Sequence, residues 1–486
     1  MILLISRAQI FIIRRIFNDE LMFLREEINL LISGATIVTM NHERTIIREG
    51  SVAVNEGKIF DVGKSADIDN KYDAGKVIEG RGRVMLPGLF DSHVHLASSL
   101  VKGLIYGEPI PLGLTYMPFG EALDEEMVYT AALLSCIDRL KNGVSYIGDV
   151  GSKHPDRVAK ALQDTGMKGT ISFGMHDKEI PNFPYSRPLP RGQTTEKALT
   201  DAERFFQRWN GAANGRLRVG FSTNIWSTSD ELYVETKKLA DEHRAIISDH
   251  LDQHRHEIEY AIRTWKERPV EHLDRLGILG PNFNAHHMVY VADREILLLT
   301  ANDVAVCHCP RAALNSHGIP KFPLFNALGI NCFLGTDMRI SDPFELMRLA
   351  SYVFHGTSGL YYYDPLVLPA ENLLEMVTIN AASAHRVREE TGSIEPGKKA
   401  DLTIVDFEKP HLTPSFDLVA ELTRYAYGSD VETVIIDGET VMEGRVIKTV
   451  DEGEILAKAR EIGEEVFEET RDRMSKTVPI NRWRVV

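Results

Sequence analysis

The sequence predicts an α/β protein built on a (β/α)8 TIM barrel that is inserted into a small β domain. Between Pro87 and Gly392, apolar β-like runs alternate with long amphipathic segments, which is the pattern of a parallel α/β fold. Short β-like runs separated by turns lie on both sides of that region. The length of 486 residues suits a large barrel with an accessory domain.

Changes in the pattern of apolar, polar and turn residues along the chain predict five segments. They are an N-terminal extension (1–28), the first part of the small domain (29–86), the barrel (87–391), the second part of the small domain (392–450), and a C-terminal helix and tail (451–486). The first β-like runs, NLLISGATIVTM, SVAVNEGKIFDVG and KVIEG, predict an antiparallel unit. We expect residues 452–473 to form the C-terminal helix.

The N-terminal extension is apolar, but Arg7, Arg14 and Arg15 interrupt it before any run reaches membrane-spanning length. It also lacks the charged start and small-residue cleavage site of a secretory signal. We expect it to pack on the body of the protein, and an interfacial anchor is the alternative. No membrane partner is predicted.

The net charge and the cysteine content limit the classes of function and the cellular compartment that we expect. A net charge of −15, from 55 basic and 70 acidic residues, provides no basic surface for nucleic acid. The four cysteines form no C-x-x-C pair, which is typical of reduced thiols in a cytoplasmic protein.

The barrel region contains a candidate strand for each of the eight positions. They are Leu89–His95, Val144–Asp149, Gly169–Gly174, Leu217–Asn224, Ala245–His250, Asn282–His287, Val304–His308 and Asn331–Asp337. Catalytic side chains of such barrels gather at the C-terminal strand ends. We therefore expect the catalytic side chains at the C-terminal ends of these strands.

Metal-ligand residue types stand at four of these strand ends. His93 and His95 are two residues apart, so they share one face of a strand, and His250, His287 and Asp337 close three later strands. Imidazoles and a carboxylate with an open position suit a catalytic Zn²⁺ or Fe²⁺ site. Taken singly, each histidine could be a hydrogen-bonded strand-end residue, and Asp337 a helix N-cap.

The segments PGLFDSHVHL, AHHMVYVADREI, VCHCP, LGTD and GSIEPGKKADLTIVD resemble the amidohydrolase superfamily. The most similar branch is that of S-adenosylhomocysteine, guanine and cytosine deaminases and triazine hydrolases. The resemblance implies a composite β-sandwich around a metal-dependent barrel, usually in a homodimer or higher homo-oligomer. It implies one metal, zinc or alternatively iron, held by His93, His95, His250 and Asp337, with His287 facing substrate and water.

These ligands predict a hydrolase that deaminates or dechlorinates a small N-heterocycle such as a triazine, a pyrimidine or a purine. A divalent metal lowers the pKa of its bound water toward ~7, Asp337 can accept that proton, and His287 can polarise the substrate. Hydrolysis of a cyclic amide or amidine is an alternative. A non-catalytic metal-binding scaffold is another.

Three positions depart from the resembling sequences. Gln253 replaces a glutamate that shuttles a proton, Ala312-Ala313 replaces a Ser-Asn pair, and Thr223 replaces a histidine. We assign Gln253 to substrate contact, since an amide cannot exchange a proton near neutral pH. Further substrate candidates are Trp226, His308 and Asp149, whereas His254 and His256 are expected to be solvated.

Overall fold

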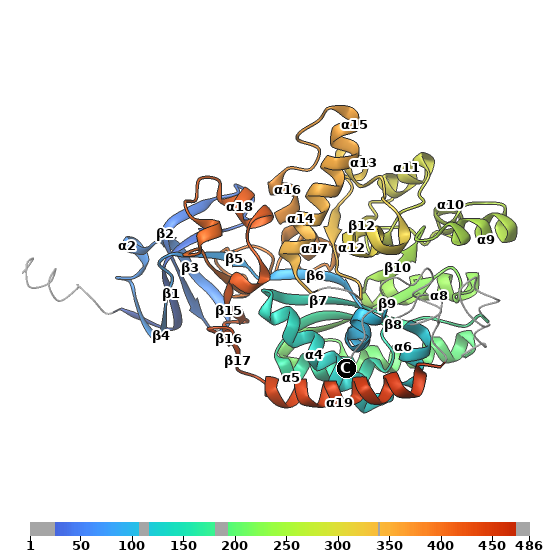
Figure 1. The fold of residues 1–486 in the computed structure, drawn as a ribbon, viewed down its shortest axis with the longest axis horizontal. Coiled ribbons are helices and arrows are strands. Elements are labelled where there is room, and N and C mark those ends of the chain that lie inside the picture. Colours follow the sequence, from blue (N-terminus) through green and yellow to red (C-terminus); the bar gives the residue numbers. More distant parts are fainter. Residues whose placement is uncertain (1–24, 106–115, 180–192, 339–340, 473–486) are drawn as a thin grey trace, which may run out of the picture.

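The computed structural model describes residues 25–105, 116–179, 193–338 and 341–472 (Figure 1). Its strands form an eight-stranded parallel sheet and a separate nine-stranded sheet. The first is a nearly closed barrel surrounded by helices, so the predicted fold class is confirmed. The N-terminal extension before residue 25 and the tail after residue 472 lie outside the described residues.

The barrel strands follow one another in chain order around the sheet. They are β6 (Leu89–Val94), β7 (Val144–Val150), β8 (Lys168–Gly174), β9 (Leu217–Asn224), β10 (Ile247–Leu251), β11 (Phe283–His287), β12 (Ala305–His308) and β13 (Cys332–Leu334). Most of their residues are buried, because parallel barrel strands are covered on both faces.

The barrel closes where β13 approaches β6. The Asp337 N–H donates to the His93 carbonyl over 2.7 Å, and Val94 and Asp337 form an isolated bridge. A Cβ on Gly335 would lie 2.4 Å from the His93 Cβ, so only glycine permits this approach. The last strand ends at Leu334 rather than at Asp337 as predicted, and Asp337 therefore lies in the following loop.

Helices and short helical turns cover the outside of the barrel. The longer ones are α4 (Glu125–Lys141), α5 (Pro155–Thr165), α6 (Thr195–Trp209), α8 (Asp230–His243), α9 (Arg255–Trp265), α10 (Pro269–Arg275), α11 (Asp293–Ala301), α14 (Pro343–Phe354) and α16 (Ala370–Met376). The others are the 3₁₀ helix η1 (Leu96–Ile105) and the short segments α3 (Met117–Ala122), α7 (Ala212–Gly215), α12 (Pro310–Ala312), η3 (Ala313–His317), α13 (Phe322–Ala327), η4 (His355–Gly359), α15 (Leu360–Tyr362) and α17 (Ile379–Ala384). Asp124, Thr194 and Ser229 cap α4, α6 and α8 by accepting a backbone N–H.

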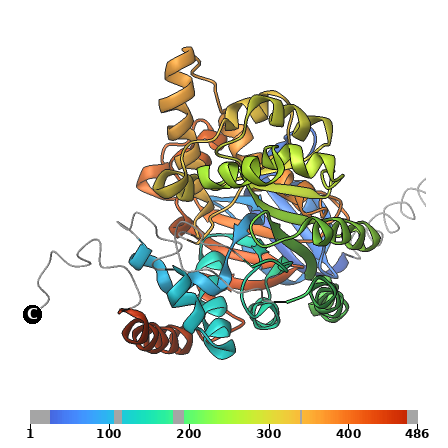
Figure 2. The same cartoon turned by 90° about the vertical axis from the view of Figure 1, so that its right-hand side faces the viewer.

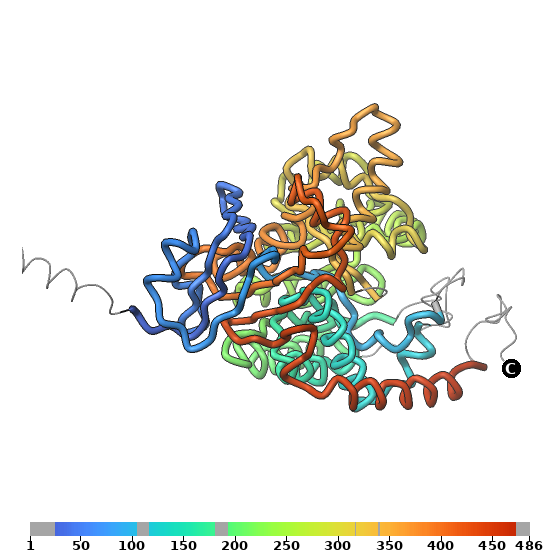
Figure 3. Tube along the Cα trace, turned by 60° about the vertical axis from the view of Figure 1, so that its left-hand side comes forward, coloured from blue at the N-terminus to red at the C-terminus, as the bar shows by residue number. Residues whose placement is uncertain are grey.

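The small domain is built from both sides of the barrel, and Figure 3 shows its early and late strands side by side. They are β1 (Glu26–Val38), β2 (Ile46–Asn55), β3 (Lys58–Lys64), β4 (Tyr72–Glu79), β5 (Arg83–Pro87), β14 (Leu402–Asp406), β15 (Val431–Ile436), β16 (Glu439–Glu443) and β17 (Val446–Ile447). Its helical turns are α2 (Ser65–Ile68), η5 (Pro410–Leu412), α18 (Leu418–Arg424) and η6 (Gly428–Asp430). The expectation of an antiparallel unit is confirmed for β1, β2 and β3, which pair antiparallel. It was wrong for the KVIEG run, because β4 pairs in parallel with β1, as β5 does, and the sheet is mixed.

The C-terminal helix α19 (Glu452–Thr470) lies outside the barrel along α4 and α3 (Figures 1 and 2). It ends three residues before the predicted Arg473. No helix in the described parts of the chain combines the length and apolar character needed to cross a membrane. All four cysteines are buried free thiols.

Candidate metal centre and active site

The five side chains singled out as metal and water ligands lie together at one end of the barrel. The ring centres of His93 and His250 are 4.9 Å apart, as are those of His93 and His287. His95 Nε2 lies 3.3 Å from His250 Nε2 and 3.7 Å from Asp337 Oδ1. At Zn–N bonds of 2.0–2.1 Å, tetrahedral ligand atoms are separated by about 3.3 Å, so this spacing fits one metal ion.

The chemistry of the donors fits a metal as well. Burial, followed by the neighbouring histidines, lowers the pKa of His93, His250 and His287 well below the ordinary value, so their imidazoles are neutral and keep a lone pair. Nε2 of His93 and of His287 is buried without a hydrogen-bond partner among the described residues. A metal or its ligands would satisfy these atoms.

Left-handed backbone at two residues shapes the site. His287 has φ 77° and Asp337 has φ 62°, a region that residues other than glycine rarely adopt. In a regular strand, neighbouring side chains point to opposite faces. The turn at His287 instead lets the rings of both His286 and His287 approach His93.

His286 contacts His93, one of the candidate metal ligands. Its Nδ1 lies 2.7 Å from His93 Nδ1. A neutral His93 that offers Nε2 to a metal carries its proton on Nδ1 and therefore donates it to His286 Nδ1. His286 is neutral, because burial lowers its pKa to about 3. The hydrogen bond fixes the ring of His93 with Nε2 directed at the centre.

A buried ion pair positions Asp337. The Arg139 guanidinium donates to Asp91 Oδ2 over 2.8 Å and to Thr336 Oγ1 over 2.9 Å. The Thr336 N–H also donates to Asp91 Oδ1 over 2.9 Å. Asp91 is on β6 and Thr336 precedes Asp337, so this network joins the first strand to the loop after the last.

The loop after His250 is held by Glu257. Its carboxylate accepts the backbone N–H groups of Asp252 and Gln253, each over 2.8 Å. The Gln253 side chain hydrogen-bonds His317.

The expectation that His254 is solvated was wrong, because its ring packs edge-on against His317 at 4.6 Å and burial lowers its pKa to about 4. His256 is half-buried.

The other substrate candidates differ in their surroundings. Asp149 accepts hydrogen bonds from the Leu96 N–H and from the N–H and hydroxyl of Ser152, so it holds the loop after β6. His308 lies between Phe322 and Phe354, and burial lowers its pKa to about 3. Trp226 is half-buried against Tyr260.

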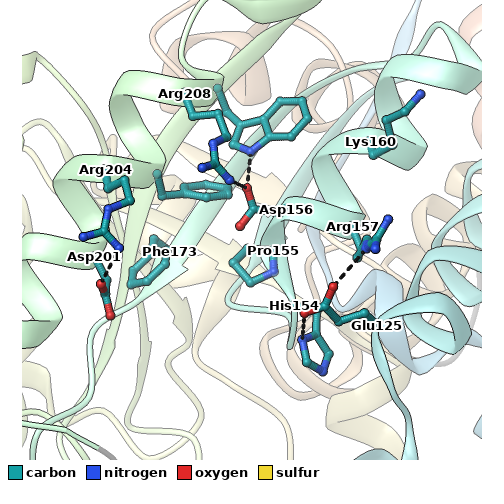
Figure 4. Close-up of a pocket in the computed structure, with 12 residues that line it drawn as sticks. Glu125, His154, Pro155, Asp156, Arg157, Lys160, Phe173, Asp201, Arg204 and Arg208 are labelled. Atoms are coloured by element: carbon teal, nitrogen blue, oxygen red, sulfur yellow. Dashed lines mark hydrogen bonds and ion pairs between the residues drawn. The ribbon is translucent and has the colours of Figure 1, made fainter.

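Two cavities differ in their relation to the site. A cavity of about 270 Å³ reaches His95 and Asp337 and is lined on its other side by Lys102 and Asp138. A larger one, of about 690 Å³, lies between α5 and α6. Figure 4 shows most of its charged residues paired with one another, such as Arg208 with Asp156 and Arg204 with Asp201. Of these two cavities, the smaller one reaches the candidate centre.

Sequence reasoning missed His286 and His317. The adjacent histidines of β11 offered a signal, but strand alternation assigns only one of them to the site. His317 follows no strand and is brought in by the π-helical turn η3, so no periodic pattern pointed to it.

A neutral imidazole cluster with a carboxylate, at the carboxyl ends of barrel strands, defines a metal-dependent barrel enzyme. Comparison with known proteins agrees with this class. The model of the amidohydrolase family matches residues 84–441. The chain is 33% identical to 5-methylthioadenosine/S-adenosylhomocysteine deaminase of Pelotomaculum thermopropionicum over 442 residues, covering 89% of this chain and 97% of the relative. It is 32% identical to 5'-deoxyadenosine deaminase of Methanosarcina acetivorans over 453 residues, 90% of this chain and 98% of the relative.

Solved structures share the fold. An adenosine deaminase from Xanthomonas campestris with bound zinc superimposes with a TM-score of 0.83 at 21% identity, over 91% of this chain and 100% of that one. The zinc complex of atrazine chlorohydrolase from Arthrobacter aurescens gives 0.78 at 18% identity, over 89% and 100%.

The chain belongs to the amidohydrolase family. The predicted resemblance and the prediction of a hydrolase are therefore confirmed, and family membership indicates a divalent metal. A non-catalytic scaffold is correspondingly disfavoured.

Proposed function

We propose that this protein is a zinc-dependent aminohydrolase that removes an exocyclic amino group from a small N-heterocycle. The convergence of His93, His95, His250, His287 and Asp337 on one point carries the proposal. The two relatives described above, which are deaminases of adenine-bearing compounds, favour deamination over dechlorination and a purine-like ring over other rings.

His93, His95, His250 and Asp337 would hold one metal. The metal would supply Lewis acidity and lower the pKa of water toward ~7. Zinc is favoured by the tetrahedral spacing of His95 and His250, although iron accepts the same donors.

In the reaction, the oxygen of water bonds to the ring carbon that bears the amino group. Asp337 accepts one proton from the attacking water and returns it to the amine, which leaves as ammonia when the C–N bond breaks. His287, whose Nε2 is without a partner among the described residues, orients the water or the ring.

The test combines elemental analysis with ammonia release from a panel of amino-purines, amino-pyrimidines and amino-triazines. Wild type should carry one zinc per chain and release ammonia from at least one compound. His93→Ala should lose metal and activity together, because removal of a ligand collapses such a site. His154→Ala, on the loop after β7, is the matched control and should retain both. Full metal occupancy in His93→Ala would refute the ligand assignment.

We also propose that the protein acts in the cytoplasm as a homo-oligomer. The segment 360–366, at the top of Figure 1 around α15, exposes apolar side chains, with Tyr361 77% and Tyr363 93% exposed. A second copy of the chain would cover them. Light scattering of wild type and Tyr361→Ser/Tyr363→Ser tests this, since the double variant should shift toward the monomer.

A further inference from the structure

His317 lies within the active site although the reaction described above does not use it. Its ring packs edge-on against His287, with ring centres 5.3 Å apart, and against His254. One of its ring nitrogens lies within 4.8 Å of a His287 nitrogen and of an Asp337 carboxylate oxygen. The residue is only 9% exposed. It is therefore close enough to His287 and Asp337 to contact a substrate that binds beside them.

Gln253 makes a side-chain hydrogen bond with one ring nitrogen of His317. The Gln253 Nε2 lies 3.0 Å from the His317 Nε2. Because an amide nitrogen only donates, this orientation of the Gln253 amide makes His317 Nε2 the acceptor and leaves the ring proton on Nδ1. This is the one side-chain hydrogen bond of Gln253 among the described residues, and Glu257 fixes the backbone from which it is made.

A neutral imidazole with a defined N–H is a good electrophile. It can stabilise charge that develops on a substrate atom without transferring its own proton. When water adds to an amino-bearing carbon of an N-heterocycle, the electron pair of the C=N bond moves onto the ring nitrogen. A hydrogen-bond donor at that nitrogen stabilises the addition. The Gln253 amide could also donate, but its side chain is flexible, whereas the His317 ring is held between its neighbours.

We propose that His317 is a catalytic residue whose Nδ1–H donates a hydrogen bond to the ring nitrogen beside the reacting carbon, and that Gln253 is the positioning residue that sets its tautomer. This rests on the proposed function. The protons balance without transfer from His317. Asp337 moves one proton from water to the amine, ammonia leaves, the ring nitrogen returns its pair to the C=N bond, and the C–OH product tautomerises to the lactam in solution. The site then selects amino-heterocycles with an unprotonated ring nitrogen at that position.

Kinetics on the zinc-loaded full chain test the role of His317. Loss of a donor to developing charge costs about 10²–10³ in kcat. His317→Leu should show this loss with zinc content unchanged and KM changed less than threefold. Gln253→Glu in the His317→Leu background should recover at least tenfold, because a protonated carboxyl can serve the same nitrogen. His256→Ala, on the neighbouring helix, is the matched control. A His317→Leu enzyme that is folded, zinc-loaded and as fast as wild type overturns the proposal.

The tautomer can be measured without turnover. In ¹⁵N-histidine-labelled, zinc-loaded protein, the His317 signals are identified by their absence in His317→Leu. Wild type should show the Nδ1–H tautomer, and Gln253→Leu should shift it toward a mixture and lower kcat about tenfold. An Nε2–H tautomer in wild type overturns the assignment. If no panel compound releases ammonia, the proposed function fails, whereas the tautomer still decides the Gln253–His317 arrangement.

Discussion

His286 contacts the proposed metal ligand His93, and the hydrogen bond between their Nδ1 atoms defines which nitrogen His93 offers. Partners of this kind orient a ligand ring and raise its basicity. His286 is an imidazole in a position where a carboxylate or a carbonyl would be usual, so its contribution can be isolated by replacement.

We expect His286→Leu to weaken zinc binding about 10- to 100-fold, since removal of such a partner leaves the His93 ring free to rotate. Competition with a chelator of known affinity measures the change. His385→Gln, which removes a buried histidine in contact with Phe90 and Tyr146 instead of His93, is the control. Equal zinc affinity in His286→Leu and wild type would show that packing alone holds His93.

At the scale of elements, the loop after β13 is tied to β6 by a buried salt bridge. Arg139 on α4 is 6% exposed at its side chain, and Asp91 on β6 is fully buried. Breaking a buried pair by removal of one partner costs about 3–5 kcal/mol, because the other charge remains without compensation. The same pair also bonds Thr336, which adjoins Asp337.

Arg139→Met should therefore lower the free energy of unfolding by about 3–5 kcal/mol and reduce zinc affinity, as measured by urea unfolding and chelator competition. Lys141→Met is the control on the same helix. Its ion pair with Glu452 is partly exposed, so the expected loss is at most about 1 kcal/mol. Similar losses in the two variants would contradict a special role for the buried network.

For the whole molecule, the barrel depends on a domain assembled from both ends of the chain. β5 and β14 pair antiparallel from Pro87–Leu402 to Arg83–Asp406. The barrel residue Lys168 is buried against Asp401, 2.7 Å away, and Asp437, 2.6 Å away. A fragment of residues 87–390 would lose both carboxylates and keep the lysine.

We expect the fragment of residues 87–390 to aggregate, because its exposed apolar surface and uncompensated Lys168 are no longer covered. Expression beside the full chain, followed by light scattering and thermal melting, measures this. A soluble monomeric fragment with a cooperative transition would show that the barrel folds independently.

The buried histidines also predict sensitivity to acid. Burial lowers the pKa of His385 to about 3 from an ordinary value of 6.5. The unfolded chain therefore binds a proton that the folded one does not, and stability present above pH 6.5 is lost as the pH falls toward 3. The slope is about 1.4 kcal/mol per pH unit for each such residue.

His385→Gln should flatten this dependence. Urea unfolding at pH 7, 6 and 5 is expected to give a stability difference from wild type that changes by about 1.4 kcal/mol per unit below pH 6.5. A difference independent of pH would mean that His385 is already protonated in the folded protein or is solvated.

The sequence by itself determined the fold class, the order of the strands and the residue types of the metal centre. These follow from short-range rules, since alternation and strand–helix periodicity bring His93, His95 and His250 to the same end of a barrel, whereas Asp337 lies in the loop after β13. It also pointed to Gln253 as the unusual residue, because its chemistry is independent of context.

The tertiary structure decided which residues contact one another in the candidate site and which strands pair in the small domain. Left-handed backbone at His287 and Asp337 departs from strand geometry, and long-range contacts maintain it, so alternation could not place both His286 and His287. His317 reaches Gln253 from 64 residues away through a π-helical turn without a periodic signature. The parallel pairing of β1 with β4 and β5 is likewise a choice among strand partners that local sequence leaves open.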